Sequence, residues 1–208
     1  MFEDRSDAGR RLAEALPEEE SSSVVIGIPR GGVAVGAEVA RLRGWDLDVV
    51  VPRKVRAPQN PELGIGAIAP GVRLLDEGMI ATLAVDPDYL VREVADQERE
   101  IARRLAAYRG DRPPLDLAGR TGIVIDDGVA TGSTAVAAVR SVRAAGARRV
   151  VVAVPVAPAE AVERLRREAD GVVCLITPAR FHAVGEWYRR FPQVQDPEVV
   201  AHLDAAWS

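Results

Sequence analysis

This sequence of 208 residues has almost no cysteine and no long apolar run. Cys174 is the only cysteine, so neither a disulfide framework nor a multi-cysteine zinc site can form within the chain. No apolar run approaches the roughly 18 residues that a membrane-spanning helix needs. Residues 1–11 mix acids with arginines where a secretory signal would be apolar. We therefore expect a cytoplasmic protein without a membrane partner.

An excess of positive charge is also missing. The formal net charge is -4, with 27 basic against 31 acidic side chains. A general nucleic-acid binder normally presents a basic face, so we expect no nucleic-acid partner. Apolar residues make up 48% and charged residues 28%, which is ordinary for a globular protein that buries a core. The length suits a single domain over residues 1–208, with a core and a small cap.

Apolar segments alternate with helical patterns along most of the chain. Short apolar segments predict buried strands, and the segments between several of them have the apolar spacing of helices. The strands are expected at residues 24–28, 49–51, 121–125, 148–154 and 172–176, and the helices at 31–43, 132–145 and 159–168. Strands with continuous apolar faces that alternate with helices are typical of a parallel sheet covered on both sides. We therefore expect an α/β fold.

Three segments in the first half of the chain interrupt this alternation. Residues 53–61 are polar and lack periodicity, which predicts an exposed, mobile loop. Residues 63–75 contain apolar runs divided by Pro70-Gly71, which predicts a hairpin. Asp86-Pro87 has the residues of a helix start, and Gly110 those of a helix end, so a long helix is expected between them.

The most informative segment joins the strand at 121–125 to the following helix. Two consecutive acids, Asp126 and Asp127, are followed by a loop of small and hydroxyl residues: Gly128, Val129, Ala130, Thr131, Gly132, Ser133 and Thr134. Ligands of open parallel sheets bind at the carboxyl ends of strands, and a helix start there favours a phosphate. The two carboxylates suit sugar hydroxyls and, through them or through water, Mg²⁺. A helix cap would explain one hydroxyl residue, but not the two acids.

This pattern of an apolar strand, two acids and a loop closing in Thr-Gly-x-Thr resembles a known motif. It is similar to the signature with which type I phosphoribosyltransferases bind 5-phosphoribosyl-1-pyrophosphate (PRPP). The resemblance implies a central parallel sheet flanked by helices, with a small hood. It implies that Asp126 and Asp127 face the ribose 2′- and 3′-hydroxyls and meet Mg²⁺ only through the diol or water. It also implies that residues 128–134 wrap the 5′-phosphate, with Gly128 where the family usually has a bulky apolar residue.

A second loop follows the first expected strand. Pro29, Arg30, Gly31 and Gly32 open the helix at 31–43, and consecutive glycines expose backbone N–H groups in a concave turn. Judged alone, this could be a helix start with a solvated arginine. Beside the PRPP motif, it resembles the family's pyrophosphate-binding loop, in which the peptide before Gly-Gly is often cis. The resemblance thus implies catalytic roles for Asp126, Asp127 and Arg30.

Basic residues gather after the second expected strand. Arg53, Arg56 and the chain's only lysine, Lys54, lie there, with Glu62 close by. In the family, a flexible loop from this region closes over the reacting centre, although a solvated charged loop would have the same composition. Transferases of 6-oxopurines carry an acid one residue before Thr-Gly, where this chain has Ala130. A hypoxanthine–guanine type is therefore not expected, and Glu62 is a candidate general base.

The hood is expected to select the acceptor, beside a core at about residues 20–177. Candidate hood segments are residues 78–118 and 178–208. The second holds Phe181, Trp187 and Tyr188, which either stack a planar base or pack the hood against the core. His182 and His202 have no partner motif and are given no role.

The resemblance implies a phosphoribosyltransferase, a glycosyltransferase of the pentosyl class. With Mg²⁺ as cofactor, it moves the phosphoribosyl group from PRPP to a nitrogenous, nucleobase-like acceptor and releases pyrophosphate, and a homodimer is possible. Two alternatives remain open at this stage. One is a PRPP-binding regulatory protein without transferase activity, and the other is an unrelated sugar-phosphate enzyme on a doubly wound sheet.

Overall fold

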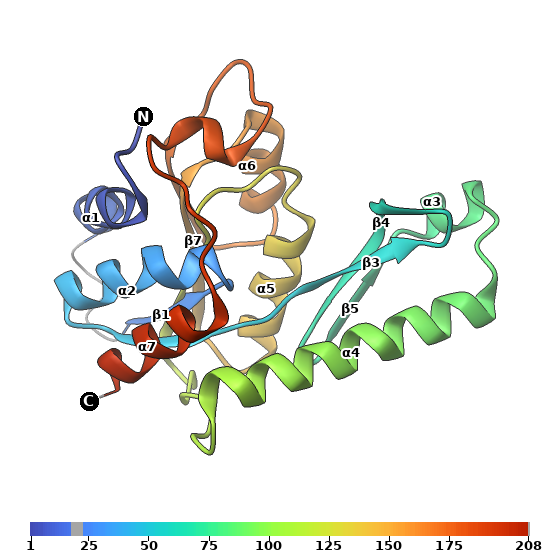
Figure 1. The fold of residues 1–208 in the computed structure, drawn as a ribbon, viewed down its shortest axis with the longest axis horizontal. Helices are drawn as coiled ribbons and strands as arrows, with labels where there is room; N and C mark the ends of the chain where they lie inside the picture. Colours follow the sequence, from blue (N-terminus) through green and yellow to red (C-terminus); the bar gives the residue numbers. More distant parts are fainter. Residues whose placement is uncertain (18–22, 208) are drawn as a thin grey trace.

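The computed structural model describes residues 1–17 and 23–207. A five-stranded sheet forms the core, and a second sheet of three strands lies in an arm that projects from it (Figure 1). Residues 18–22 and 208, which fall within the expected domain, core and hood boundaries, lie outside the described residues. None of the described helices is long and apolar enough to cross a membrane.

The core sheet has the strand order β2-β1-β6-β7-β8, and all its neighbouring strands are parallel. Its strands are β1 (Ser23–Gly27), β2 (Asp46–Val49), β6 (Thr121–Ile125), β7 (Arg149–Val156) and β8 (Gly171–Ile176). Successive strand residues point to opposite faces, so each face has its own apolar cluster. The expected α/β class and parallel sheet are confirmed.

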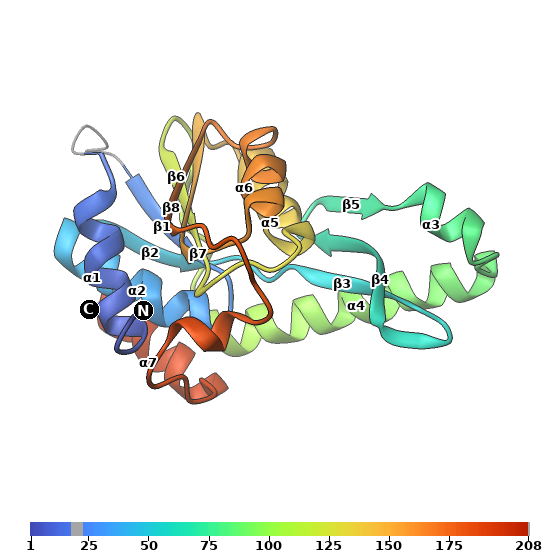
Figure 2. The same cartoon turned by 90° about the horizontal axis from the view of Figure 1, so that it is seen from above.

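Helices cover both faces of this sheet (Figures 1 and 2). On one face lie α1 (Arg5–Ala15), α2 (Gly31–Arg43) and α7 (Asp196–Ala206), and on the other α5 (Ser133–Ala144) and α6 (Ala159–Arg166). A short 3₁₀ helix, η1 (Val184–Trp187), lies in the segment before α7. Both chain ends lie on the side of the core away from the arm.

The arm combines the antiparallel sheet with two helices. Its elements are β3 (Arg53–Ala57), β4 (Asn60–Ala69), β5 (Val72–Leu75), α3 (Glu77–Thr82) and α4 (Pro87–Arg109). The long helix α4 runs from the tip of the arm back to the core (Figures 1 and 2). Asp86 caps its start by accepting from the N–H of Asp88 at 2.8 Å, and Gly110 ends it at a φ of 58°, as the sequence predicts.

The prediction of an exposed loop at residues 53–61 is wrong. These residues form β3 and the start of β4, which pair as an antiparallel hairpin. The reason is a partner that the local sequence does not reveal: α4 packs along β3. Glu93 of α4 accepts from the Arg56 guanidinium at 2.8 Å, and Gln97 of α4 accepts from Arg53 at 2.9 Å, so the arginines that suggest a solvated loop are bound to α4 within the arm. The predicted hairpin at 63–75 is confirmed as β4 and β5, which turn at Gly71.

The strand expected at residues 49–51 lies earlier, at 46–49. Its apolar pattern is interrupted by Asp48, a carboxylate that is buried within the strand. Arg109 donates to both oxygens of Asp48, at 2.9 and 3.1 Å, and the N–H of Leu115 donates at 3.0 Å. A buried charge satisfied in this way is compatible with a strand at the edge of the core sheet, but the partners lie about 60 residues away in the chain.

The segments expected to form one hood divide between two places. Most of residues 78–118 belong to the arm, together with the strands at 53–75, which the sequence places within the core. Residues 178–207 instead lie against the core, where Phe2 pairs with Tyr188 and α7 packs near α2 and the end of α4. The arm and this C-terminal tail therefore border the core from different directions.

Candidate functional site

The two loops singled out in the sequence lie side by side because β1 and β6 are neighbouring parallel strands. Gly27 and Ile125 are paired at their carboxyl ends, and the N–H of Ile28 donates to the oxygen of Ile125 at 2.8 Å. A Cβ on Gly31 would lie 1.8 Å from Asp127 Oδ2, and one on Gly32 would lie 2.4 Å from the oxygen of Ile125. Glycine is therefore required where the loops meet.

The peptide bond between Pro29 and Arg30 is cis, which the resemblance implied. Arg30 lines a cavity of about 550 Å³ together with Asp126 and Asp127. Its guanidinium lies 3.8 Å from an oxygen of Asp196 and is partly exposed. The positively charged Arg30 side chain thus lines the same cavity as the two acids.

Each of the two acids has one oxygen engaged by the protein. Asp126 Oδ1 accepts from the N–H of Asp127 at 2.9 Å, and Asp127 Oδ2 accepts from Arg5 at 2.8 Å. No described residue outside the pair donates to the second oxygen of either carboxylate, and the two acid side chains lie within hydrogen-bonding reach of each other. Two neighbouring acceptors on the cavity wall match what a vicinal diol needs, because each hydroxyl donates one hydrogen bond.

Burial raises the pKa of Asp126 well above its usual range, and the neighbouring Asp127 raises it further. The charged form of Asp126 is therefore costly without a ligand. A hydroxyl donor or a cation at its second oxygen would stabilise that form. The electrostatics of the pair favour a ligand that brings hydrogen-bond donors or positive charge.

The loop at residues 128–134 leads into α5. The N–H of Val129 is bound to the oxygen of Val156 at 2.9 Å and fixes the start of the loop. Gly132 is the N-cap residue of α5, with a φ of 83°, and provides no capping side chain. The first amide N–H groups of α5 are thus left for another acceptor, as a phosphate site requires.

Gly128 has a structural explanation. A Cβ at this position would lie 2.5 Å from a methyl carbon of Val184, in the tail. Val184 therefore occupies the space that a bulky residue would fill at position 128.

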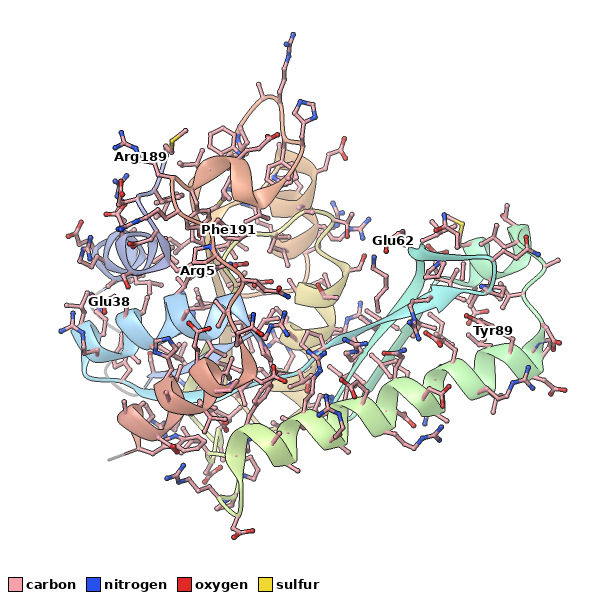
Figure 3. The ribbon with its side chains drawn as sticks, in the orientation of Figure 1. Arg5, Glu38, Glu62, Tyr89, Arg189 and Phe191 are labelled. Atoms are coloured by element: carbon pink, nitrogen blue, oxygen red, sulfur yellow. The ribbon has the colours of Figure 1, made fainter. Side chains whose placement is uncertain are left out.

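A second cavity, of about 980 Å³, lies between the loop at 128–134 and the arm. Asp126 and Thr134 line both cavities, so the two are adjacent at the acid pair. Lys54 and Glu62 line the second cavity from the arm. Figure 3 shows Glu62 on the arm, well separated from Arg5 in the core.

The four residues expected in a flexible loop are therefore divided by the structure. Lys54 and Glu62 face the loop at 128–134 across the second cavity. Arg53 donates to Gln97 at 2.9 Å and Arg56 donates to Glu93, so both join β3 to α4. These two arginines link β3 to α4, one by a hydrogen bond and one by an ion pair, and neither lines a cavity.

The aromatic residues of the tail lie beside the site but do not all face it. Tyr188 is buried, its ring 5.3 Å from that of Phe2, and its hydroxyl donates to the backbone oxygen of Asp127 at 2.6 Å. Burial raises the pKa of Tyr188. These contacts favour packing over base stacking for Tyr188. Phe181 and Trp187 do not line either cavity, whereas Phe191 lines the first.

Three further residues at the cavities were missed in the sequence. Arg5 binds Asp127 from α1, Gln193 lines the first cavity from the tail, and Arg164 of α6 donates to Ser133 Oγ at 3.2 Å. Neither Arg5 nor Arg164 lies within a sequence motif, and both are far in sequence from the residues that they contact. Nothing in the local sequence distinguishes either of them from the many other arginines.

A family model and similar known proteins point to the same family. Residues 3–189 match the family model described as "Phosphoribosyl transferase domain". Two Mycobacterium tuberculosis proteins with the provisional name phosphoribosyl transferase are 46% identical over 208 residues, which cover 99% of this chain and 47% of theirs. The chain thus spans about half the length of these relatives. A uracil phosphoribosyltransferase of Streptomyces avermitilis is 31% identical over 142 residues, 66% of this chain and 65% of that protein.

Solved structures share the fold. A crystal structure of a Thermus thermophilus protein has a TM-score of 0.83 and 48% identity, and the match covers 97% of each chain. A purine phosphoribosyltransferase from Pyrococcus horikoshii has a TM-score of 0.50 at 17% identity, covering 92% of this chain and 93% of that one. At that identity the similarity concerns the fold alone.

Proposed function

This chain belongs to the phosphoribosyl transferase family, and on that premise we propose that it is a magnesium-dependent enzyme that uses PRPP. It transfers the phosphoribosyl group to a nitrogenous, nucleobase-like acceptor and releases pyrophosphate. The observation that carries this proposal is the pair of half-engaged carboxylates between two cavities. One cavity is lined by Arg30, and the other by the start of α5, where no side chain caps the first amide N–H groups.

The two cavities suit the two ends of PRPP. The second cavity offers backbone N–H groups, a helix start and the Arg164 guanidinium for the 5′-phosphate. The first offers Arg30 and the Gly31-Gly32 turn for the pyrophosphate. The acid pair lies where they meet, so a ribose bound by its diol would direct its two charged groups in opposite directions.

Mg²⁺ fits the oxygens that the acid pair leaves without a protein partner. Mg²⁺ prefers oxygen ligands and keeps several waters, and it is commonly bound through substrate phosphates. No group of three or more metal-ligating side chains occurs within residues 1–17 and 23–207. Asp126 and Asp127 would hold the ion indirectly, through the diol or water. When bound, the ion neutralises charge on the pyrophosphate.

In the proposed reaction, the bond from ribose C1 to the pyrophosphate oxygen breaks and its electron pair leaves with pyrophosphate. The acceptor nitrogen forms the new bond to C1 and releases its proton to a base. Glu62 on the arm lines the second cavity, so it would serve as that base only for an acceptor bound on the arm side of the ribose. Arg30 stabilises the departing charge, and the acid pair holds the sugar while positive charge develops on the ring.

The acceptor is expected beside the tail, where Phe191 and Gln193 line the first cavity. The relatives named for their acceptors differ, one being a uracil and another a purine phosphoribosyltransferase. Membership of the family therefore does not identify the acceptor. The tail, which lines the first cavity, is the segment expected to select it.

Release of pyrophosphate from PRPP, with Mg²⁺ and a panel of nucleobases, tests the proposal. Turnover is expected with at least one base and is expected to fall at least about 100-fold in the Asp126→Asn, Asp127→Asn double variant. PRPP binding without turnover across the panel would support the regulatory alternative. Equal PRPP binding by the wild type and the double variant would instead support an unrelated sugar-phosphate enzyme.

A further inference from the structure

Arg5, the first residue of α1, reaches the acid pair from outside the motifs. Its side chain is 11% exposed, and both Nε and Nη2 lie 2.8 Å from Asp127 Oδ2. Its Nη1 donates to the backbone oxygen of Pro192 at 2.7 Å, and its guanidinium carbon lies 3.8 Å from the centre of the Phe191 ring. Figure 3 shows Arg5 and Phe191 close together in the core. One side chain thus connects the first helix, the acid and the tail.

Anchoring of α1 does not explain this arrangement. Leu12 and Ala13 are buried in the main apolar cluster, and Gly9 lies so close to α2 that an added Cβ would be 2.7 Å from the backbone oxygen of Val35. Phe2 is buried against Tyr188. The helix is therefore attached by apolar contacts, and a buried guanidinium is not needed for that purpose.

The geometry at Asp127 does explain it. Both donors of Arg5 converge on Oδ2, which leaves Oδ1 without a donor from any other described residue outside the acid pair. The planar guanidinium, held by Pro192 and stacked on Phe191, has little freedom to move. Turning the carboxylate out of its plane would break both contacts, so Arg5 fixes the direction in which the other oxygen points. Its charge also offsets one of two adjacent acids.

We propose that Arg5 is a positioning residue that fixes the Asp127 carboxylate with Oδ1 presented to the ribose diol. The inference rests on the proposed function, because the diol is that of PRPP. Arg5 lines the same cavity as Arg30, so direct binding of the pyrophosphate by Arg5 is the competing role. The two roles differ in which part of the ligand each would affect.

Titration calorimetry with three ligands separates these roles. Ribose 5-phosphate carries the full diol, 2-deoxyribose 5-phosphate lacks one hydroxyl, and inorganic pyrophosphate has no sugar. The wild type is expected to prefer ribose 5-phosphate over the deoxy sugar by about tenfold, the effect of one charge-assisted hydrogen bond. Arg5→Ala is expected to reduce that preference to below about threefold while leaving pyrophosphate affinity within about twofold.

Arg10→Ala is the matched control, since Arg10 lies on the same helix, is half exposed and pairs only with Asp7 among the described residues. It is expected to keep the wild-type preference. Arg5→Lys, which retains the charge but not the planar fork, is expected to fall between the wild type and Arg5→Ala. Thermal unfolding of each variant shows whether it is folded.

The outcomes are distinguishable. A wild type that binds none of the three ligands overturns the proposed function itself. A wild type that prefers the diol, with Arg5→Ala preferring it equally, overturns the role of Arg5 and leaves the proposed function standing. Loss of pyrophosphate affinity in Arg5→Ala, with the sugar preference intact, assigns Arg5 to the pyrophosphate and contradicts the positioning role.

Discussion

The core and the arm of this chain differ in how much polar pairing accompanies their apolar packing. In the core, both faces of the sheet are covered by apolar side chains, largely valine, isoleucine, leucine and alanine. In the arm, Val55 and Val94 are buried in the same apolar cluster, but Arg56 also pairs with Glu93 and Arg53 with Gln97 between β3 and α4, and α3 has no buried residue. Ion pairs respond to pH and salt more than apolar burial does. The contact between β3 and α4 should therefore weaken under conditions that leave the core intact, although both regions contribute walls to the cavities.

Of the changes considered, Gly31→Ala in the core should have the largest effect on ligand binding. The new Cβ would lie 1.8 Å from Asp127 Oδ2, so the loop and the acid must move apart. A displacement of this size at a binding group is expected to lower PRPP affinity about 100-fold, measured by calorimetry. Gly78→Ala in the arm is the control, because its Cβ would meet no atom closer than 3.5 Å. Comparable losses in both variants would contradict this prediction.

Glu93→Gln should loosen the arm. Glu93 is nearly buried and accepts from Arg56 and Gln97, whereas Arg56 is partly in water, so the expected loss of local stability is about 1.5 kcal/mol. Hydrogen exchange should quicken in β3 and α4 but not in β6. Glu98→Gln removes an exposed acid of the same helix that pairs with Arg73, and it should change exchange little.

The effect of Glu93 should also depend on pH. Burial raises its pKa, but hydrogen bonds from Arg56 outweigh this, and the pKa is lowered from its ordinary value of 4.5. A carboxyl with a lowered folded-state pKa stabilises above its unfolded pKa, and that contribution is lost as the pH falls through the folded value. The difference in exchange between wild type and Glu93→Gln should therefore be full at neutral pH and shrink below pH 4.5. A difference independent of pH would exclude the ion pair as its cause.

Asp126→Asn should change the stability of the fold in the opposite direction to Glu93→Gln, raising it where Glu93→Gln lowers it. Because the folded-state pKa of Asp126 is raised, the unfolded state releases this proton first, so the stability falls as the pH rises above the ordinary pKa of 3.8 and levels off above the folded-state pKa. The amide should raise stability by about 1 kcal/mol at neutral pH, at the expense of ligand binding. The gain should shrink toward pH 3.8 and vanish below it, where the acid is protonated in both states. Melting temperatures of wild type and variant across this range test the sign.

Arg164→Ala should have the smallest effect. Its guanidinium donates to Ser133 Oγ at the rim of the loop at 128–134, for which we propose phosphate binding, and it is largely exposed. Affinity for ribose 5-phosphate is expected to fall about fivefold. Arg166→Ala, on the same helix but paired with Glu163, should leave affinity unchanged. Equal affinities for wild type and Arg164→Ala would remove Arg164 from the phosphate site.

The same comparison explains what the sequence could predict. Strands β1, β6, β7 and β8 are apolar over most of their lengths, so their positions and the adjacency of the loops that follow β1 and β6 could be inferred locally. The arm could not, because Arg53 and Arg56 look solvated until Gln97 and Glu93 of α4 are brought beside them.

Long-range pairing also limits the prediction of the site. Asp126, Asp127 and the loop at 128–134 were evident from one contiguous motif. Arg5 reaches Asp127 across 122 residues, and only the packing of α1 and the tail brings the two together. The sequence left open whether Tyr188 stacks a base or packs the hood against the core, and the packing of the tail directs that ring inward and places Phe191 at the cavity.

The contacts of the first helix with the tail set a rule for building chimaeras. Phe2 pairs with Tyr188, and Arg5 is held by Pro192 and Phe191, so the two ends of the chain form one interdependent unit beside the acids. A tail grafted from a relative to change acceptor preference would meet an N-terminus shaped for another sequence. Exchanging residues 1–15 together with 178–207 would keep those matched surfaces, and a transplant of the tail alone would not.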